Sequence, residues 1–261
     1  MSNLLDNIYI IEDGFNTNYI SCLLLTIFLE KNIIYNNLLL NDNISVEYFY
    51  LQELIKNLIN DFKIYKIMNS SKLNYFRNMI FFKGFKDPKL ILDNNSIIDL
   101  YEFILEKFNV PKIEFINISS NLNSVESFNY IDLKINNIEI DIKKLIEKTF
   151  ENRLLNNIPN FIGIKLSREQ NNFLCDIQKK IKFNSIYNYS NKTDTQLIWE
   201  ISCIICYDFE ISNYFSFIIV KNNWYMINQF NIPSIQKINI KDYELLIKLK
   251  TIFTIYKFSD K

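Results

Sequence analysis

Histidine is absent from all 261 residues, and glycine and proline are scarce, at three and four residues. Because histidine is the commonest general base at neutral pH, its absence excludes any reaction that depends on an imidazole in this chain. Net charge is also absent, since 29 lysine and arginine residues balance 29 aspartate and glutamate residues. No positive field therefore attracts nucleic acid or an anionic membrane, and we expect neither as a partner.

Long hydrophobic runs are missing too. The longest apolar runs, such as 19–29, are far shorter than the roughly 18 residues that cross a bilayer. We expect no cleavable signal peptide, and we expect the four cysteines, which stand in apolar or strand-like settings, to be reduced thiols. We therefore expect a soluble, intracellular and cytoplasmic protein, with association with a virion as the alternative. Asparagine, isoleucine and lysine are abundant, a bias typical of the A+T-rich coding DNA of parasites and large DNA viruses.

The hydrophobic pattern changes near the middle of the chain. Apolar residues at helical spacing predict helices first, and short β-branched and aromatic runs predict strands from residue 112 onward. Because no Pro/Gly-rich linker divides these halves, we expect one α+β domain over 1–261, with a helical lobe at 10–110 and a β lobe at 111–257. The predicted helices cover 19–30, 46–62, 96–108 and 141–152.

The stretch from Asp13 to Phe28 begins with turn-forming residues and continues into an apolar helix. The first turn of a buried helix can lower the pKa of a thiol and stabilise an oxyanion. The stretch resembles the cysteine box of ubiquitin-specific proteases, which are papain-like cysteine proteases. Asn18 falls on the catalytic cysteine of that box. The residues that match the box in register are Asn16, Thr17, Tyr19, Leu23 and Leu24.

Two further boxes of that family follow in order. The segment 158–168, IPNFIGIKLSR, resembles the family's Leu-Pro-x-Val-Leu-x-Ile-x-Leu-Lys-Arg strand. The strand 199–206 and the segments 212–217 and 224–229 then resemble the histidine box and its surroundings. Asn213 falls on the histidine, and Asn228 falls on the residue that orients it.

The resemblance implies a papain-like α+β fold with a reduced fingers region, but the chemistry departs from the family. Amides at Asn18 and Asn213 supply neither a thiolate nor a base near neutral pH. Asp13 takes the position from which the family's asparagine donates to the oxyanion, and a carboxylate there repels negative charge. We therefore expect no catalytic residue, cofactor or metal, and a protein that acts by binding ubiquitin, a ubiquitin-like protein or a protein complex. The candidate residues of the binding cleft are Asn18, Tyr19, Asn213, Tyr214 and Trp224.

Two alternative functions remain open at this point. Cys22 lies four residues after Asn18, on the same helix face, and could act as a displaced nucleophile in an active deubiquitinase. We favour a core position for it, since no histidine is present to activate the thiol. The other alternative is a structural subunit of a viral particle or complex. Cys203 and Cys206 form a CxxC, but on a strand this spacing turns the two side chains to opposite faces, so it predicts core positions and no zinc site.

Overall fold

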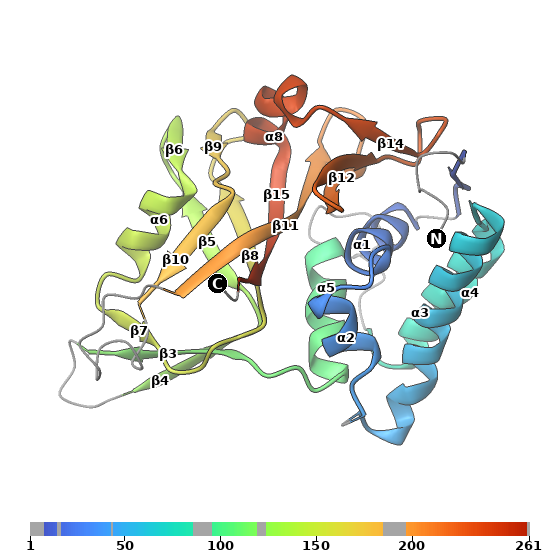
Figure 1. Ribbon diagram of the computed structural model, residues 1–261, viewed down its shortest axis with the longest axis horizontal. Helices are drawn as coiled ribbons and strands as arrows, with labels where there is room; N and C mark the ends of the chain where they lie inside the picture. Colours follow the sequence, from blue (N-terminus) through green and yellow to red (C-terminus); the bar gives the residue numbers. More distant parts are fainter. Residues whose placement is uncertain are drawn as a thin grey trace. The chain divides into compact units, whose positions relative to one another are not determined.

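A computed structural model describes residues 8–14, 17–42, 44–85, 96–118, 124–184 and 197–259 (Figure 1). The chain forms two compact units. The first consists of the chain up to Val110 together with Ile205–Tyr243, and the second of Pro111–Ile204 together with the chain from Glu244. The sequence predicts a border at residue 110 between a helical lobe and a β lobe. Residues 205–243, however, belong with the helices and not with the rest of the predicted β lobe, because their strand β12 packs on helix α1.

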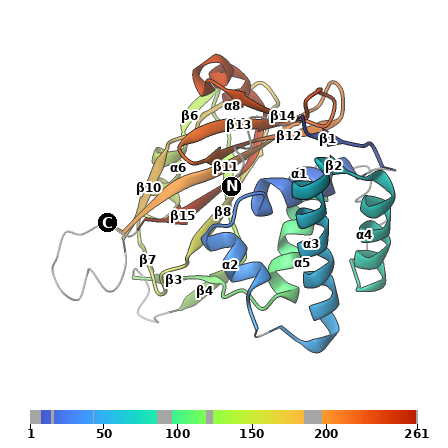
Figure 2. The ribbon, with the colours of Figure 1, turned by 45° about the vertical axis from the view of Figure 1, so that its right-hand side comes forward.

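Helix α1 (Asn18–Phe28) is the centre of the first unit. Its residues from Tyr19 to Phe28 are all buried and most of them are apolar, as expected of a helix enclosed by other elements. It packs against the other helices of this unit and against β12, as the views in Figures 1 and 2 agree. Those helices are α2 (Ile33–Leu39), α3 (Val46–Tyr65), α4 (Ser70–Phe82) and α5 (Ser96–Lys107).

The strands of the first unit form two sheets. The larger has the order β14-β13-β12-β11, where β11 (Leu197–Asp208) contributes its last residues. Lys221 and Asn222 both have positive φ and form the two-residue turn between β12 and β13, a geometry that fits the twist of a hairpin. The other strands are β12 (Asn213–Val220), β13 (Asn223–Ile227), β14 (Ile235–Ile238) and the parallel pair β1 (Ile10–Ile11) and β2 (Ile67–Met68).

The second unit contains a sheet in the order β10-β11-β15-β8-β5, a three-stranded sheet β4-β3-β7, and the parallel pair β6-β9. Its core includes Phe115, which stacks on Phe150 with ring centroids 4.3 Å apart. The strands of the first sheet are β5 (Ile131–Ile135), β8 (Phe161–Arg168), β10 (Lys180–Phe183) and β15 (Thr251–Phe258). The remaining elements are β3 (Ile113–Asn117), β4 (Val125–Phe128), β6 (Glu139–Asp141), α6 (Ile142–Thr149), β7 (Arg153–Leu155), β9 (Leu174–Asp176) and α8 (Glu244–Lys250).

The predicted helices all exist, with ends that differ by a few residues. The helix predicted to end at residue 62 continues to Tyr65, and the one predicted at 141–152 is the shorter α6, with Asp141 as its cap. Helices α2 and α4 were not predicted from the sequence. Among the described residues no single helix is long and apolar enough to cross a bilayer; α1 and α2 meet the length and composition only together, across a bend of 114°.

Candidate functional site

Asn18 is the first residue of α1, and its side chain is partly exposed. Thr17 precedes it as the N-cap, but its hydroxyl is buried and makes no hydrogen bond within the described part of the chain. The chain also approaches itself closely here, since a Cβ on Gly14 would lie 2.5 Å from Oγ1 of Thr17. The helix therefore begins without a side-chain cap, and Asn18 projects from its first turn.

Asn213 and Asn228 come from the two strands of one hairpin. Asn213 is the first residue of β12, and Asn228 follows the last residue of β13. The register that places Ser216 opposite Ile227 brings the start of one strand alongside the end of the other. Ser212, immediately before Asn213, has a φ of 49°, the left-handed conformation that favours glycine.

The three asparagines form one continuous chain of hydrogen bonds. Asn18 Nδ2 donates to Asn213 Oδ1 over 2.7 Å, and Asn213 Nδ2 donates to Asn228 Oδ1 over 3.2 Å. Asn18 also pairs with the backbone of Tyr214: its Oδ1 accepts from the Tyr214 N–H at 2.8 Å, and its Nδ2 lies 3.5 Å from the Tyr214 carbonyl. The donor and the acceptor of the Asn18 side-chain amide thus both make hydrogen bonds. We call Asn18, Asn213 and Asn228 the amide array.

A second chain of hydrogen bonds lies beside the amide array. Gln229 Nε2 donates to Asp13 Oδ1 over 3.1 Å, and Ser21 Oγ lies within hydrogen-bond distance of both Gln229 Oε1 (3.3 Å) and the Asn18 carbonyl (3.1 Å). Asp13 itself is exposed. Ser21 and Gln229 are not among the predicted site residues, although Ser21 lies one helical turn after Asn18 and Gln229 directly follows Asn228.

The candidate residues of the binding cleft do not lie together on a surface. Asn18 is partly exposed, but Asn213, Tyr214 and Tyr19 are buried, with 1%, 6% and 3% of their surface exposed. Burial raises the pKa of the Tyr19 phenol to about 12, a shift that the charge of Arg77 opposes. Trp224 is partly exposed near the start of β13, whereas Asn228 follows its end, so Trp224 lies roughly 13 Å along the strand from the array. Packing within the first unit takes up the three buried side chains, and a role of these residues in a binding cleft stays a prediction.

Cys22 lies one turn of α1 beyond Asn18 and is buried. Burial raises the pKa of its thiol to about 12, although hydrogen bonds with Ser216 and Thr26 lower it slightly. Those two hydroxyls also bond to each other over 2.6 Å, which joins α1 to β12. This thiol is surrounded by hydroxyl groups and apolar side chains, which is the environment of a core residue and the opposite of an activated nucleophile.

Alkaline pH is expected to destabilise the protein through its buried acids. The pKa of Cys22 and of Cys175 is raised by burial from 9.0 to about 12, and that of Tyr19 from 10.0 to about 12. The unfolded chain therefore releases these protons first as the pH rises, so the stabilisation is complete below about pH 9 and is lost progressively toward pH 12. Each group contributes a slope of up to about 1.4 kcal/mol per pH unit.

Urea unfolding at pH 8, 9, 10 and 11 measures this loss. The midpoint should fall steadily above pH 9. Cys22→Ser removes one titrating group, so the midpoint of this variant should fall less steeply over the same range. A midpoint that does not change between pH 8 and pH 11 would contradict the burial of these groups.

The other cysteines also lie in the core. Cys203 and Cys206 are buried on β11, with 1% and 0% exposure, and their spacing along a strand turns them to opposite faces. Cys175 is buried on β9. Within the described residues, no three histidine, cysteine, aspartate or glutamate side chains gather as metal ligands.

Arg168, the last residue of the 158–168 segment, has a structural role in the second unit. It donates to the carbonyls of Phe173 and Lys248 over 2.9 Å each, and also to the carbonyl of Thr251. Its guanidinium thus holds the end of helix α8 and the start of β15 at the end of β8. These bonds explain why an arginine ends this strand.

No family model matches the chain, and no curated protein matches it either. Solved structures do match. The Ubp8-Sgf11-Sgf73-Sus1 SAGA DUB module has a TM-score of 0.63 at 12% identity over 97% of this chain and 68% of that chain. The Pan2 pseudoubiquitin hydrolase-RNA exonuclease module of Saccharomyces cerevisiae, in complex with AAUUAA RNA, has a TM-score of 0.65 at 11% identity over 97% of this chain and 54% of that chain. A Ubp8 variant in the SAGA DUB module bound to monoubiquitin matches with a TM-score of 0.55 at 12% identity over 97% of this chain and 69% of that chain.

These matches define the fold as that of the ubiquitin-specific-protease-like deubiquitinases. The predicted α+β fold class is confirmed. The chain spans 68% of the SAGA DUB module chain and 54% of the Pan2 chain, so each of those chains contains more than the part matched here.

Proposed function

We propose that this protein is a catalytically inactive relative of the ubiquitin-specific proteases that acts by binding, with ubiquitin, a ubiquitin-like protein or a protein complex as its partner. One observation carries the proposal: an array of three hydrogen-bonded amides stands where the resemblance places nucleophile, base and orienting residue. An amide has neither a nucleophilic anion nor a basic nitrogen near neutral pH. Both ends of the Asn18 amide are also committed to hydrogen bonds within the fold.

The environment of Asp13 supports the same proposal. Its carboxylate is exposed beside the amide array and accepts a hydrogen bond from Gln229. In a hydrolase, negative charge develops on the oxyanion, and a carboxylate nearby raises the energy of that state. Cys22 does not compensate, since its thiol is buried and its pKa is raised to about 12. The expected location for such a binding protein is inside the cell.

Binding to ubiquitin tests the proposal directly. Unlabelled protein titrated into isotope-labelled ubiquitin should shift the amide resonances of the ubiquitin C-terminal tail, and ubiquitin lacking its Gly-Gly end should bind more weakly. If neither form binds at high micromolar concentration, the partner is another protein and the role as a structural subunit is favoured. The neighbour bound to monoubiquitin is the precedent for this choice of ligand.

Turnover is tested separately. The protein should neither cleave a fluorogenic ubiquitin substrate nor react with an electrophilic ubiquitin probe, and Cys22→Ser should behave in the same way. Turnover that Cys22→Ser abolishes would overturn the proposal in favour of a displaced nucleophile.

A further inference from the structure

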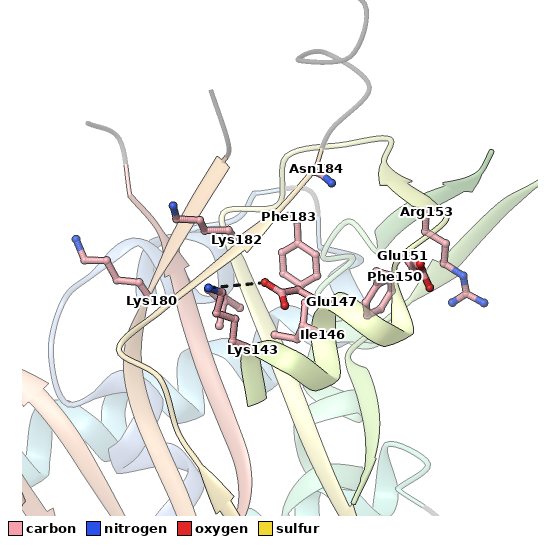
Figure 3. Close-up of a pocket in the computed structure, with 11 residues that line it drawn as sticks. Lys143, Ile146, Glu147, Phe150, Glu151, Arg153, Lys180, Lys182, Phe183 and Asn184 are labelled. Carbon is pink, nitrogen blue, oxygen red and sulfur yellow. Dashed lines mark ion pairs between the residues drawn. The ribbon is translucent and has the colours of Figure 1, made fainter. Parts of the chain in front are cut away.

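A pocket of about 460 Å³ lies in the second unit, between strand β10 on one side and helix α6 with the turn that follows it on the other (Figure 3). All four residues of β10, from Lys180 to Phe183, line it. Successive side chains of a strand point to opposite faces, so a pocket that touches all four runs along the edge of the strand. In the described part of the chain β10 pairs with β11 alone, so this edge ends the sheet.

The hydrogen-bond register shows which backbone groups face the pocket. Ile201 donates its N–H to the Lys179 carbonyl over 2.9 Å, and Lys180 lies opposite Glu200. Bonded and non-bonded pairs alternate in an antiparallel ladder, so Ile181 and Phe183 turn their backbone groups toward β11. The N–H and C=O of the even-numbered residues, including Lys182, therefore point to the outer edge.

The chain itself begins a ladder on this outer edge. Leu155 of β7 donates its N–H to the carbonyl of Asn184 over 2.9 Å, which agrees with the alternation. The next outward position is Lys182, and no residue in the described ranges bonds to its N–H or C=O. An extended segment placed along β10 would continue the ladder from there, the mode of recognition known as strand addition.

The floor of the pocket is apolar and its rim is charged. Phe150 and Phe183 meet edge to face with centroids 5.6 Å apart, and Ile146 lies beside them. Four cations, Lys143, Arg153, Lys180 and Lys182, line the pocket, against the two carboxylates of Glu147 and Glu151.

The rim cations differ in how they are engaged. Lys143 pairs with Glu147 at 3.8 Å, Arg153 with Glu126 at 3.3 Å and Lys180 with Glu200 at 2.8 Å, and all of these pairs are partly exposed. Such pairs contribute about 0–1 kcal/mol and exchange partners easily. Lys182 is exposed and has no ion pair with any described residue.

We propose that the outer edge of β10 binds an extended acidic segment of a partner protein, which pairs its backbone with Lys182 and places an apolar side chain against Phe150 and Phe183. Lysines on an edge strand repel a second copy of the same strand, so they oppose self-association but favour an acidic strand. Glu147 and Glu151 in the same rim oppose a polyphosphate ligand. This surface lies apart in the sequence from the amide array, and the proposal does not depend on the function proposed for that array.

Three fluorescein-labelled peptides test the proposal on the full chain by fluorescence anisotropy. The first is Glu-Val-Glu-Phe-Glu-Val-Glu, the second has lysine in place of each glutamate, and the third is the acidic peptide with alternate backbone nitrogens methylated. The acidic peptide should bind, and the other two should bind at least about tenfold more weakly. The lysine peptide loses charge complementarity, and the methylated peptide loses the backbone hydrogen bonds to β10.

A matched pair of variants assigns the binding to the edge of β10. Lys182→Glu should weaken binding of the acidic peptide about tenfold or more, since an attraction becomes a repulsion. Lys134→Glu, the same reversal at an exposed lysine on β5, should leave binding unchanged. Thermal unfolding should show that both variants are folded, and hydrogen exchange should show protection of the Lys182 amide by the acidic peptide.

The following results would overturn the proposal. Absence of binding by the acidic peptide at millimolar concentration, or equal binding by its methylated form, overturns the proposal. Equal effects of Lys182→Glu and Lys134→Glu would do so too, because the binding would then depend on overall charge. Displacement of the acidic peptide by single-stranded RNA at comparable concentration would assign the surface to nucleic acid instead.

Discussion

Asn18→Ala is expected to lower the free energy of unfolding by about 2–4 kcal/mol. The change removes the bonds from Asn18 to Asn213 Oδ1, to the Tyr214 N–H and to the Tyr214 carbonyl. Asn213 is 1% exposed, so its side-chain oxygen Oδ1 loses the Asn18 donor at a position that bulk water reaches poorly. The buried start of β12 then bears the cost of polar groups without these partners.

Chemical denaturation of the variant and of a matched control measures this effect. Asn78→Ala is the control, since Asn78 is exposed on α4 and the change should alter stability by no more than about 0.5 kcal/mol. Equal stability of the two variants would contradict the hydrogen-bond pattern of the amide array. The expected difference would show that the array stabilises the fold at the place where a hydrolase keeps reactive groups.

The largest chemical effect is expected from Asn18→Cys combined with Asn213→His. The donor and acceptor atoms of the array are 2.7 Å and 3.2 Å apart, so the new thiol and imidazole should come within hydrogen-bond reach, with Asn228 still in place to orient the ring. The helix N-terminus and the imidazolium should lower the pKa of the new thiol by about 1–3 units from its ordinary value. Cleavage of ubiquitin conjugates should stay feeble, because Asp13 still opposes the oxyanion.

The rate of alkylation by iodoacetamide as a function of pH measures that pKa. The four native cysteines are buried, so the introduced thiol should dominate the reaction. Asn18→Cys alone is the matched control, and its rate should rise at a higher pH than that of the double variant. Coincident pH profiles would show that Asn213 does not face Asn18 in solution. The single variant remains informative even if the double variant fails to fold, because an exposed thiol at the helix start should still react far faster than Cys22.

Much of the fold can be predicted from local pattern, and the site from spacing. The positions of Asn18, Asn213 and Asn228 follow from short matches to the cysteine box and the histidine box, because each box sets where a helix or strand begins or ends. The burial of Tyr19 and Tyr214 could not be predicted in this way. Their burial depends on packing between segments about 195 residues apart, and no local pattern encodes it.

Helices α2 and α4 and the register between β10 and β11 could not be predicted from the sequence either. Helix α2 is only seven residues long and depends on Asn32, whose side chain accepts from two backbone N–H groups at its start. Helix α4 carries just three buried apolar positions, too few for a strong periodic signal. The outward direction of the Lys182 backbone depends on whether Lys179 or Lys180 bonds to β11, which alternation of side chains alone does not decide.

Each unit combines an earlier and a later segment of the chain, which affects how the protein folds during synthesis. The first unit is complete only when Ile205–Tyr243 has been made, and the second only when the segment from Glu244 has been made. Neither unit can therefore finish folding before its later segment has left the ribosome, and until then each is a partial structure with exposed apolar surface. Deletion of β15 would remove a central strand from the sheet β10-β11-β15-β8-β5, whose other strands all precede it in the chain. The folding of the strands in the middle of the chain therefore depends on β15.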